Sequence, residues 1–392
     1  MYDAFSRMEN LLGTKGVKRL GSAKIAVFGI GGIGSYVVEA LARCGVGSLT
    51  LVDNEDISLT DINRQLYALR SAIGRKKVQV AKEHIRDIDE DILVHTYETY
   101  YSNDTAGMFD LKAYDYIVDA MNSLASKILL IEQAKELVAA GAKELILVAQ
   151  ETTLYGVDLY GEKSLHRLLD ELNKIEDLFW IRIMYCYPEE IYEGLIDAMI
   201  RNKKVCHYLD IPIQHTNDTI LKRMGRRTSN ADLVKIITHL RERIPDITLR
   251  TTLICGFPGE TQEMHEELMQ FINDMEFDRL GAFTYSPEEG TPAAEFTDQV
   301  DENLKKDWQA DVMELQEEII FDKNETMKGR ELYVFIEGKV SDENAYVGRT
   351  YRDAPDVDGY IFINTDEELM TGDIAKVRVT GAYEYDLIGE LI

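Results

Sequence analysis

Lys24–Gly34 reads KIAVFGIGGIG, an apolar run of strand length followed at once by closely spaced glycines. The pattern predicts a strand over residues 24–30, a phosphate-binding turn and a helix over residues 35–43. In such a turn one glycine permits the tight bend, one lets the backbone approach a phosphate, and one lets helix and strand pack closely. The glycines placed for these roles are Gly29, Gly31, Gly32 and Gly34.

The residues that follow favour a triphosphate over a dinucleotide. A second predicted strand, residues 48–52, ends in Asp53, which is placed to accept a hydrogen bond from a ribose hydroxyl. The segments LTDINRQ and GRKKV then add polar and cationic candidates, namely Asn63, Arg64, Gln65 and Lys77. A guanidinium and an ammonium aimed at one site suit a triphosphate better than a bridging pyrophosphate. The dehydrogenase interpretation that the glycines alone would allow is therefore disfavoured.

The segments AFSRMENLLG, LVDNEDISLTDINRQ and YDYIVDAMNS carry a resemblance over residues 1 to about 130. They are similar to the ThiF-like, ubiquitin-activating-type adenylation enzymes, in particular the bacterial branch that dehydrates threonylcarbamoyladenosine in tRNA. The resemblance implies ATP and Mg²⁺, Asp53 on the ribose, and Asn63, Arg64 and Lys77 around the phosphates. It also implies tRNA as a partner and a homodimer that shares Arg7. Asn122 stands where that family has a metal-binding aspartate.

Beyond the first third, apolar runs of strand length alternate with segments of helical period. This order predicts parallel strands with right-handed crossovers, in an open sheet or a barrel. Polar residues cluster at the predicted carboxyl ends of the strands, which is the face where barrel sites lie. The strands are expected near residues 144–149, 179–184, 205–211, 248–254 and 279–283, and the helices near 126–140, 164–175, 189–202, 232–243 and 260–275.

The last part changes period. Residues 304–324 form a polar amphipathic segment that predicts a connecting helix. After Lys328 the apolar residues alternate with polar ones in short runs separated by glycines, which predicts a small five-stranded OB-like barrel.

The segments CHYLDIPIQHTNDTILKRMGRRT, LRTTLICGFPGET and FTYSPEEGTPAA carry a second resemblance, from about Glu132 to the end. They are similar to the radical-SAM methylthiotransferases that modify an aspartate of a small-subunit ribosomal protein. The resemblance implies a partial (β/α) barrel that binds S-adenosylmethionine and a C-terminal TRAM module that docks a basic ribosomal protein. The candidate S-adenosylmethionine contacts are Gln150, Arg182, Gln214, His215 and Arg250.

The cysteines do not fit the chemistry of that second family. The chain has four, Cys44, Cys186, Cys206 and Cys255, and none is closely spaced with another. The cysteine-triad loop of the family is absent, and a 4Fe–4S cluster needs thiolates to hold it. We therefore expect no cluster to assemble, no metal held by protein side chains apart from the Mg²⁺ that accompanies ATP, and no reductive cleavage of S-adenosylmethionine.

Charge and hydropathy limit the kinds of partner that we expect for this chain. The net charge is −27, with residues 1–126 near neutral and almost all of the excess in the remainder. Such an acidic region repels nucleic-acid phosphates and attracts basic proteins. No stretch approaches the roughly 18 apolar residues that span a bilayer, so we expect no membrane and a cytoplasmic location.

Taken together, the sequence predicts an α/β chain in which a Rossmann-like nucleotide-binding half-domain joins a partial radical-SAM barrel and a small all-β module. The expected parts are residues 1–130, 131–300, a connecting helix 301–327 and a TRAM barrel 328–392. The functional hypothesis is a methylthiotransferase-family protein with an ATP-binding segment and with radical chemistry lost. The alternatives are a tRNA threonylcarbamoyladenosine dehydratase-like adenylating enzyme, a non-catalytic binder of a ribosomal protein, and an artefactual fusion. The join itself leaves open one continuous sheet or two separate cores.

Overall fold

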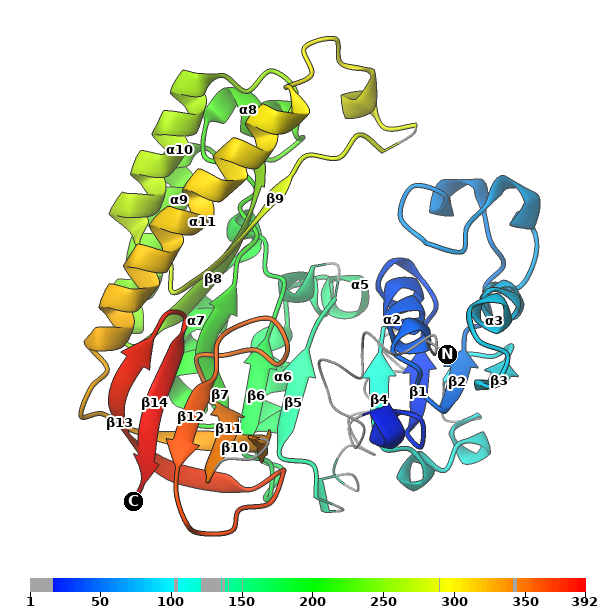
Figure 1. Cartoon of the computed structure of the whole chain (residues 1–392). Helices are drawn as coiled ribbons and strands as arrows, with labels where there is room; N and C mark the ends of the chain where they lie inside the picture. The colour runs from blue at the N-terminus through cyan, green and yellow to red at the C-terminus, as the bar shows by residue number, and fades with distance from the viewer. Residues whose placement is uncertain are drawn as a thin grey trace, which may run out of the picture. The chain divides into compact units, whose positions relative to one another are not determined.

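The chain divides into two compact units, Met1–Ala142 and Lys143–Ile392, drawn together in Figure 1. This computed structural model describes residues 17–101, 105–120, 135, 138–139, 141–149, 151–288, 290–340 and 344–392. Among its described helices, none is both long enough and apolar enough to cross a membrane.

The first unit is built on a four-stranded parallel sheet of order β3-β2-β1-β4. Because β1 lies between β2 and β4, the strand order reverses beside it, and α/β sheets bind ligands at such a reversal. Its strands and helices are β1 Lys24–Phe28, α2 Gly32–Arg43, β2 Ser48–Val52, α3 Lys77–Ile88, β3 Leu93–Tyr97 and β4 Tyr116–Asp119. Short 3₁₀ turns occupy Leu59–Asp61, Arg70–Ala72, Ala106–Met108 and Leu111–Ala113.

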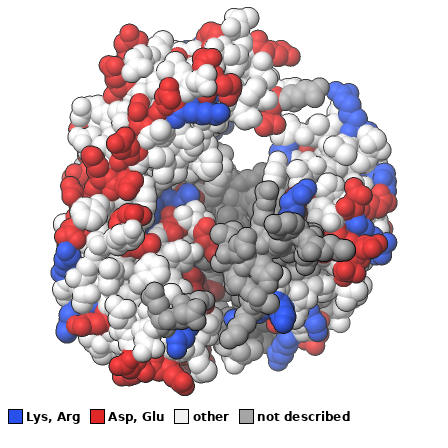
Figure 2. Space-filling view, viewed as in Figure 1, with Lys and Arg blue, Asp and Glu red and all other residues white. Residues whose placement is uncertain are grey.

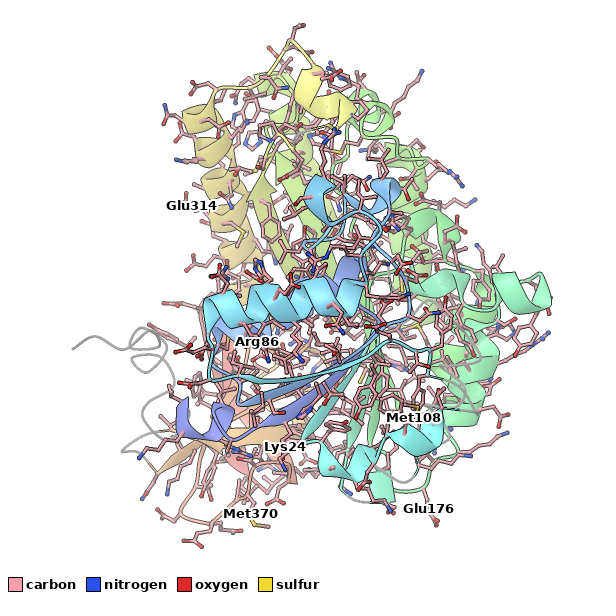
Figure 3. All side chains as sticks on the ribbon, turned by 90° about the vertical axis from the view of Figure 1, so that its right-hand side faces the viewer. Lys24, Arg86, Met108, Glu176, Glu314 and Met370 are labelled. Carbon is pink, nitrogen blue, oxygen red and sulfur yellow. The ribbon has the colours of Figure 1, made fainter. Side chains whose placement is uncertain are left out.

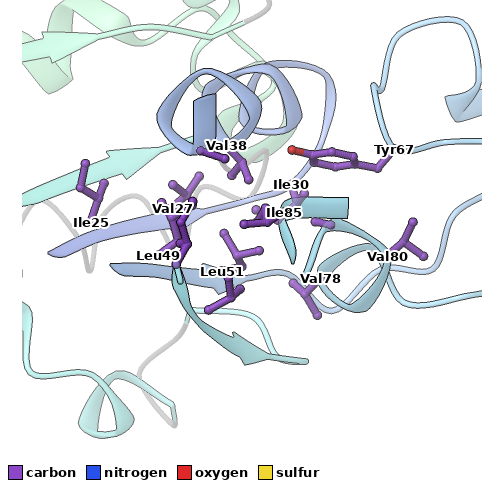
Figure 4. Close-up of a cluster of buried hydrophobic side chains, with 14 of the residues drawn as sticks. Ile25, Val27, Ile30, Val38, Leu49, Leu51, Tyr67, Val78, Val80 and Ile85 are labelled. Atoms are coloured by element: carbon purple, nitrogen blue, oxygen red, sulfur yellow. The ribbon is translucent and has the colours of Figure 1, made fainter. Parts of the chain in front are cut away.

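Both faces of this sheet are apolar, as a parallel sheet requires. On one face Val27 and Leu51 of the central strands pack with Val38 of α2 and Ile85 of α3 (Figure 4). Figure 3 shows α3, the helix that carries Arg86, lying across the sheet. On the other face an aromatic cluster forms around the ring of Phe28.

The second unit begins with an all-parallel sheet whose strands follow chain order, β5-β6-β7-β8-β9. Its elements are β5 Glu144–Leu147, α5 Val157–Tyr160, α6 Leu165–Leu172, β6 Trp180–Ile183, α7 Glu193–Arg201, β7 Val205–Asp210, α8 Asp218–Arg223, α9 Asn230–Arg243, β8 Thr248–Cys255, α10 Gln262–Met275 and β9 Arg279–Thr284. Short 3₁₀ turns occupy Thr152–Leu154, Pro188–Glu190 and Pro292–Glu295.

The two faces of this sheet differ in cover. Along β8, Leu249, Thr251 and Leu253 are fully buried, whereas Arg250, Thr252 and Ile254 are only half-buried. Successive side chains of a strand point to opposite faces, so the first set lies under the helices and the second set lies on the less covered face. Figure 1 shows α9, α10 and α11 together on one side of the sheet.

A long helix leads from the sheet to a closed β-barrel of order β10-β11-β12-β14-β13. The core of the β-barrel is apolar and continuous, which supports the folding of a small all-β module. The elements are α11 Glu302–Glu325, β10 Glu331–Lys339, β11 Ala345–Arg349, β12 Ile361–Asn364, β13 Ile374–Tyr383 and β14 Asp386–Leu391.

The loop after β11 joins this barrel to the less covered face of the sheet. Asp353 in the loop is fully buried and forms an ion pair with Arg279 of β9. Asp358 accepts a hydrogen bond from the Tyr208 hydroxyl of β7 at 2.7 Å. Ala354 packs with Trp180 of β6 in an apolar cluster. The β-barrel is thereby fastened to three strands of the sheet.

These observations confirm the predicted fold class, with parallel α/β sheets followed by a five-stranded closed β-barrel. Within each unit the strand next to the join belongs to that unit's own sheet, since β4 pairs with β1 and β5 pairs with β6. The compact units divide between Ala142 and Lys143.

Candidate functional site

The glycine turn after β1 has the local geometry of an anion site. Gly29 has φ +89°, a conformation that favours glycine, and its N–H donates to the Val52 carbonyl at 2.8 Å. A Cβ added at Gly34 would lie 1.8 Å from the Gly29 carbonyl oxygen, so helix and turn touch there. A Cβ at Gly31 would meet no atom within 4 Å. The turn is therefore closed by Gly29 and Gly34 and open beside Gly31.

The first turn of α2 presents its N–H groups at this open place. Gly31 is the N-cap of α2 and makes no side-chain capping hydrogen bond, and Gly32 is the first helical residue. The first N–H groups of a helix lack partners within the helix and, with the helix dipole, favour an anion. The open space beside Gly31 is therefore next to the hydrogen-bond donors of the first turn of α2.

Asp53 lies at the carboxyl end of β2 and ties the turn to its neighbour strand. Its Oδ2 accepts the Ile30 N–H at 2.7 Å and its Oδ1 accepts the Glu55 N–H at 2.8 Å. Burial raises the pKa of Asp53, against these two donors and the charge of Lys77, which lower it. Each carboxylate oxygen keeps a second lone pair, so the group can still accept from a hydroxyl.

The two predicted cations each have a carboxylate partner. Lys77 begins α3, its side chain is 3% exposed, and its Nζ lies 2.5 Å from Glu55 Oε2. Arg64 is half exposed and donates to Asp61 Oδ1 at 2.9 Å. Burial opposes ionisation of Asp61, but hydrogen bonds from Ser58 and the charges of Lys77 and Arg64 lower its pKa.

The segment that carries Asn63 and Gln65 is held against the glycine turn. The Leu66 N–H donates to the Ser35 hydroxyl of α2 at 3.1 Å, which places the segment beside that helix. Gln65 is buried and donates to Asp61 Oδ1 at 2.8 Å, whereas Asn63 is exposed. Asp53 thus contacts the glycine turn at Ile30 and interacts with the charge of Lys77, whereas Arg64 is held by Asp61 in the neighbouring segment. Arg7 and Asn122 lie outside the described residues.

Glu55 and Asp61 complete this site and were not among the sequence candidates. Their roles as partners of Lys77 and Arg64 depend on side-chain contacts that spacing does not reveal. The available signal is the run of acidic residues in LVDNEDISLTD, which surrounds Asp53. Carboxylates beside cations in one polar segment indicate ion pairs that position the cations.

In the second unit, strained backbone marks the carboxyl edge of the sheet. Tyr185 follows β6 with φ +63° and Gln214 follows β7 with φ +71°. Such conformations cost on the order of 1 kcal/mol or more for residues other than glycine and gather at functional sites. Gln214 is half-buried and bridges to Leu253 of β8. Gln150 lies outside the described residues.

His215 is enclosed by protein. Its Nδ1 accepts the Asn217 N–H at 3.0 Å, so the ring proton sits on Nε2. Nε2 lies 3.2 Å from Glu260 Oε1, without the alignment of a hydrogen bond, and both side chains are fully buried. Glu260 Oε2 accepts N–H groups of Gly256 and Phe257 at 2.6 and 3.1 Å. The pair therefore holds the turn after β8.

Arg182 and Arg250 join the sheet to the β-barrel. Arg182 is 0% exposed, donates to Glu144 at 2.9 Å and to the Tyr351 carbonyl at 2.7 Å, and stacks over Tyr208. Arg250 donates to Asp210 at 3.0 Å and lies 3.3 Å from Asp358. Both guanidinium groups are thus engaged by groups of the protein.

The cysteines do not form a cluster site. Cys44 lies in the first unit and the other three lie in the second, where they are buried. Burial raises the pKa of Cys206 and of Cys255 to about 12 and that of Cys186 well above its usual value. Iron–sulfur clusters are held by several thiolates at one site, whereas the three thiols of the second unit are buried as part of its core. Over the described ranges, no three His, Cys, Asp or Glu side chains are arranged to hold a metal.

Three family models match successive parts of the chain. Residues 5–149 match the ThiF family, residues 124–272 the radical SAM superfamily and residues 329–392 the TRAM domain. The first two matches overlap over residues 124–149, around the join between the two units. The fold and these matches define a ThiF-type unit followed by a radical-SAM-type sheet and a TRAM β-barrel.

Relatives with the same description resemble most of the chain. The ribosomal protein uS12 methylthiotransferase RimO of Lachnoclostridium phytofermentans is 58% identical over 260 residues, which are 66% of this chain and 59% of that protein. The RimO of Clostridium kluyveri is 40% identical over 365 residues, which are 91% of this chain and 81% of that protein. The chain belongs to the RimO family. It spans 59% of the length of the first of these relatives.

A solved structure resembles the first unit. The crystal structure of E. coli tRNA N6-threonylcarbamoyladenosine dehydratase, TcdA, in complex with AMP is 34% identical, with a TM-score of 0.33. The match covers 34% of this chain and 55% of that chain.

Proposed function

We propose that the first unit of this RimO-family protein binds ATP with Mg²⁺. The observation that carries the proposal is the open space beside Gly31 at the uncapped start of α2, with the cations Arg64 and Lys77 nearby. Asp53 would hold the ribose. Asn63 and Gln65 lie in the same segment, and Arg7 and Asn122 join the proposed site by the resemblance to adenylating enzymes.

The second unit would use S-adenosylmethionine as a ligand without cleaving it reductively. Of the candidate contacts, Gln214 is the one that we place against the ligand, because it lies at the strained carboxyl edge of the sheet. Gln150 would extend that contact. Arg182, His215 and Arg250 are engaged within the protein and would support the site from behind. The core thiols do not fit a 4Fe–4S cluster, so no radical step is assigned.

The partner would be a basic small-subunit ribosomal protein, bound through residues 328–392. The relatives act on ribosomal protein uS12 according to their names, and the acidic charge of the second unit complements a basic partner. The first unit would add tRNA binding and a homodimer contact, both from its resemblance to tRNA-modifying adenylating enzymes. A protein that uses ATP and ribosomal components would work in the cytoplasm.

Nucleotide binding is tested by calorimetric titration with ATP and Mg²⁺. Lys77→Met should weaken binding about tenfold or more, since it removes a nearly buried charge beside the phosphates. Arg86→Gln is the matched control, because Arg86 is an exposed cation in the last turn of the same helix. Equal affinities for both variants and the parent would overturn the assignment of Lys77. Absence of ATP binding by the parent would overturn the proposal.

The same assay extended to products separates binding from adenylation. An adenylating enzyme converts ATP to AMP and pyrophosphate when its carboxyl substrate is present. The intact nucleotide turn favours this second candidate function, and tRNA carrying threonylcarbamoyladenosine is the substrate to try. Formation of AMP that depends on the tRNA would establish it, and ATP binding without AMP would leave the first unit as a nucleotide-binding module.

A further inference from the structure

A pocket of about 480 Å³ lies among the helices of the second unit, and its lining begins at Thr216, shortly after Gln214. It is formed by the segment that leads into α8, the start of α9 and the later turns of α10. Three carboxylates line it, those of Asp218, Glu267 and Asp274. The acidic residues of this unit gather along the side formed by α10 and α11 in Figure 2.

Each of the three carboxylates is held by a neutral donor. Asp218 accepts the Asn230 N–H at 2.7 Å, Glu267 accepts from the Asn217 amide at 2.7 Å, and Asp274 accepts from the Gln270 amide at 2.8 Å. Within the described part of the chain, none of them has a Lys, Arg or His partner within ion-pair distance. Their negative charges are therefore uncompensated by the protein and face one pocket.

The rest of the lining suits the stem of a long cationic side chain. Phe271 is buried, and Val234 and Met275 are half-buried, so the pocket combines an apolar part with an acidic part. Lysine and arginine bury their methylene stems on apolar surface while the charged head finds polar partners.

Thr216 gives a second and independent sign of a ligand. It lines the same pocket and is 1% exposed, yet its Oγ1 has no hydrogen-bond partner among the described residues. A buried hydroxyl without a partner costs free energy that a bound N–H group would recover. Its position beside the uncompensated carboxylates points to a ligand that donates hydrogen bonds and carries positive charge.

We propose that this pocket receives a lysine or arginine side chain from a basic protein segment. The inference deepens the proposed function, on which it rests for the nature of the partner, since it adds a docking point on the helices to the one expected on the β-barrel. The apolar lining would pack against the stem, and the three carboxylates and the Thr216 hydroxyl would accept from the head.

The test uses the full chain and a fluorescent hexa-arginine peptide, with hexa-citrulline as the neutral peptide of matched shape. Fluorescence anisotropy at low salt should show the arginine peptide binding at least about tenfold more tightly. The variant Glu267→Gln with Asp274→Asn should weaken the arginine peptide about fivefold or more. Both replacements keep an acceptor for the Asn217 and Gln270 amides, so the fold is retained, as the melting temperature would show.

The matched control removes the same charge elsewhere. Glu266→Gln with Asp307→Asn changes two exposed carboxylates on α10 and α11 that do not line the pocket. This control should bind like the parent. A site-specific readout is the ¹³C-methyl signal of Met275, which should move on addition of the arginine peptide and stay in place with hexa-citrulline.

Three results would overturn the proposal. These are equal weakening by the pocket variant and the control, an unmoved Met275 signal, and a Met275 signal that responds to Mg²⁺ alone. Binding of purified uS12 is measured in parallel to separate this site from the proposed function. If uS12 binds while the peptide does not occupy the pocket, the docking proposal is refuted and the proposed partner is retained. If the peptide occupies the pocket while uS12 does not bind, the docking proposal is retained and the proposed partner is refuted.

Discussion

Two glycines of the turn after β1 differ in what a methyl group would meet. Gly34→Ala should destabilise the first unit by about 3 kcal/mol, because the new Cβ would lie 1.8 Å from a backbone oxygen. Gly31→Ala should change the free energy of unfolding by less than about 1 kcal/mol but weaken ATP binding, because its methyl would occupy the open space. Urea unfolding and ATP titration of both variants check this. Equal effects on folding would contradict it.

The backbone of Gln214 is strained, so replacing this residue should have opposite effects on stability and on ligand binding. Gln214→Gly should stabilise the second unit by about 1 kcal/mol, because glycine adopts φ +71° without cost. The same change should weaken binding of S-adenosylmethionine, since it removes the side chain that we place against the ligand. Urea unfolding and calorimetric titration measure the two effects. A loss of stability would show instead that the side chain holds the fold.

At the residue scale, the sequence predicted candidate site residues better than it predicted the groups that they contact in the folded protein. Gly29, Gly31 and Asp53 have a local pattern, because turn, strand end and helix start are neighbours in the chain. Arg182 has no such pattern. Its partner is the carbonyl of Tyr351, 169 positions away, and only the folded structure brings the two together.

Between elements, the ion pair of Arg279 and Asp353 fastens the β-barrel loop to β9. Arg279→Met should cost about 3–5 kcal/mol, because it leaves the buried carboxylate of Asp353 without its ion-pair partner. Adding Asp353→Leu should recover most of the loss, since neither charge then remains. Urea unfolding of the parent and the two variants tests this. A double variant no more stable than the single one would contradict it.

The same pair makes the junction sensitive to acid. Burial opposes ionisation of Asp353, but the charges of Arg279 and Arg352 prevail and lower its pKa. A carboxyl whose pKa is lower folded than unfolded adds stability above the unfolded value, near 4, and loses it as the pH falls. The double variant should therefore lose less stability than the parent on acidification.

At the element scale, the hydrophobic period was sufficient to predict the strands of the second sheet but not a short helix that follows one of them. All five strands of the second sheet lie where strand-length apolar runs predict them, because parallel strands are buried on one or both faces. The short helix α8 was not predicted, since six residues carry too little period. The β-barrel follows period two along β13, where buried and exposed residues alternate.

At the scale of the whole molecule, two compact units predict two unfolding transitions. ATP should raise the stability of the first unit by about 2.7 kcal/mol at a hundred times its dissociation constant and leave the second unit unchanged. Differential scanning calorimetry with and without ATP and Mg²⁺ measures this. A single transition that moves as a whole would mean that the units unfold together.

The sequence could not decide how the join is built. Both predicted units place a strand, a helix and a strand near residues 116–149, so local pattern fits one sheet or two. Pairing between strands is a long-range property, and the structure pairs β4 with β1 and β5 with β6.

The central proposal is that the first unit of this RimO-family chain binds a nucleotide and that the chain's thiols do not assemble an iron–sulfur cluster. The most direct measurement is the yield of 5′-deoxyadenosine from S-adenosylmethionine after anaerobic reconstitution with iron and sulfide and addition of a reductant. We predict no 5′-deoxyadenosine above the protein-free control. Formation of 5′-deoxyadenosine in proportion to the protein would contradict the account.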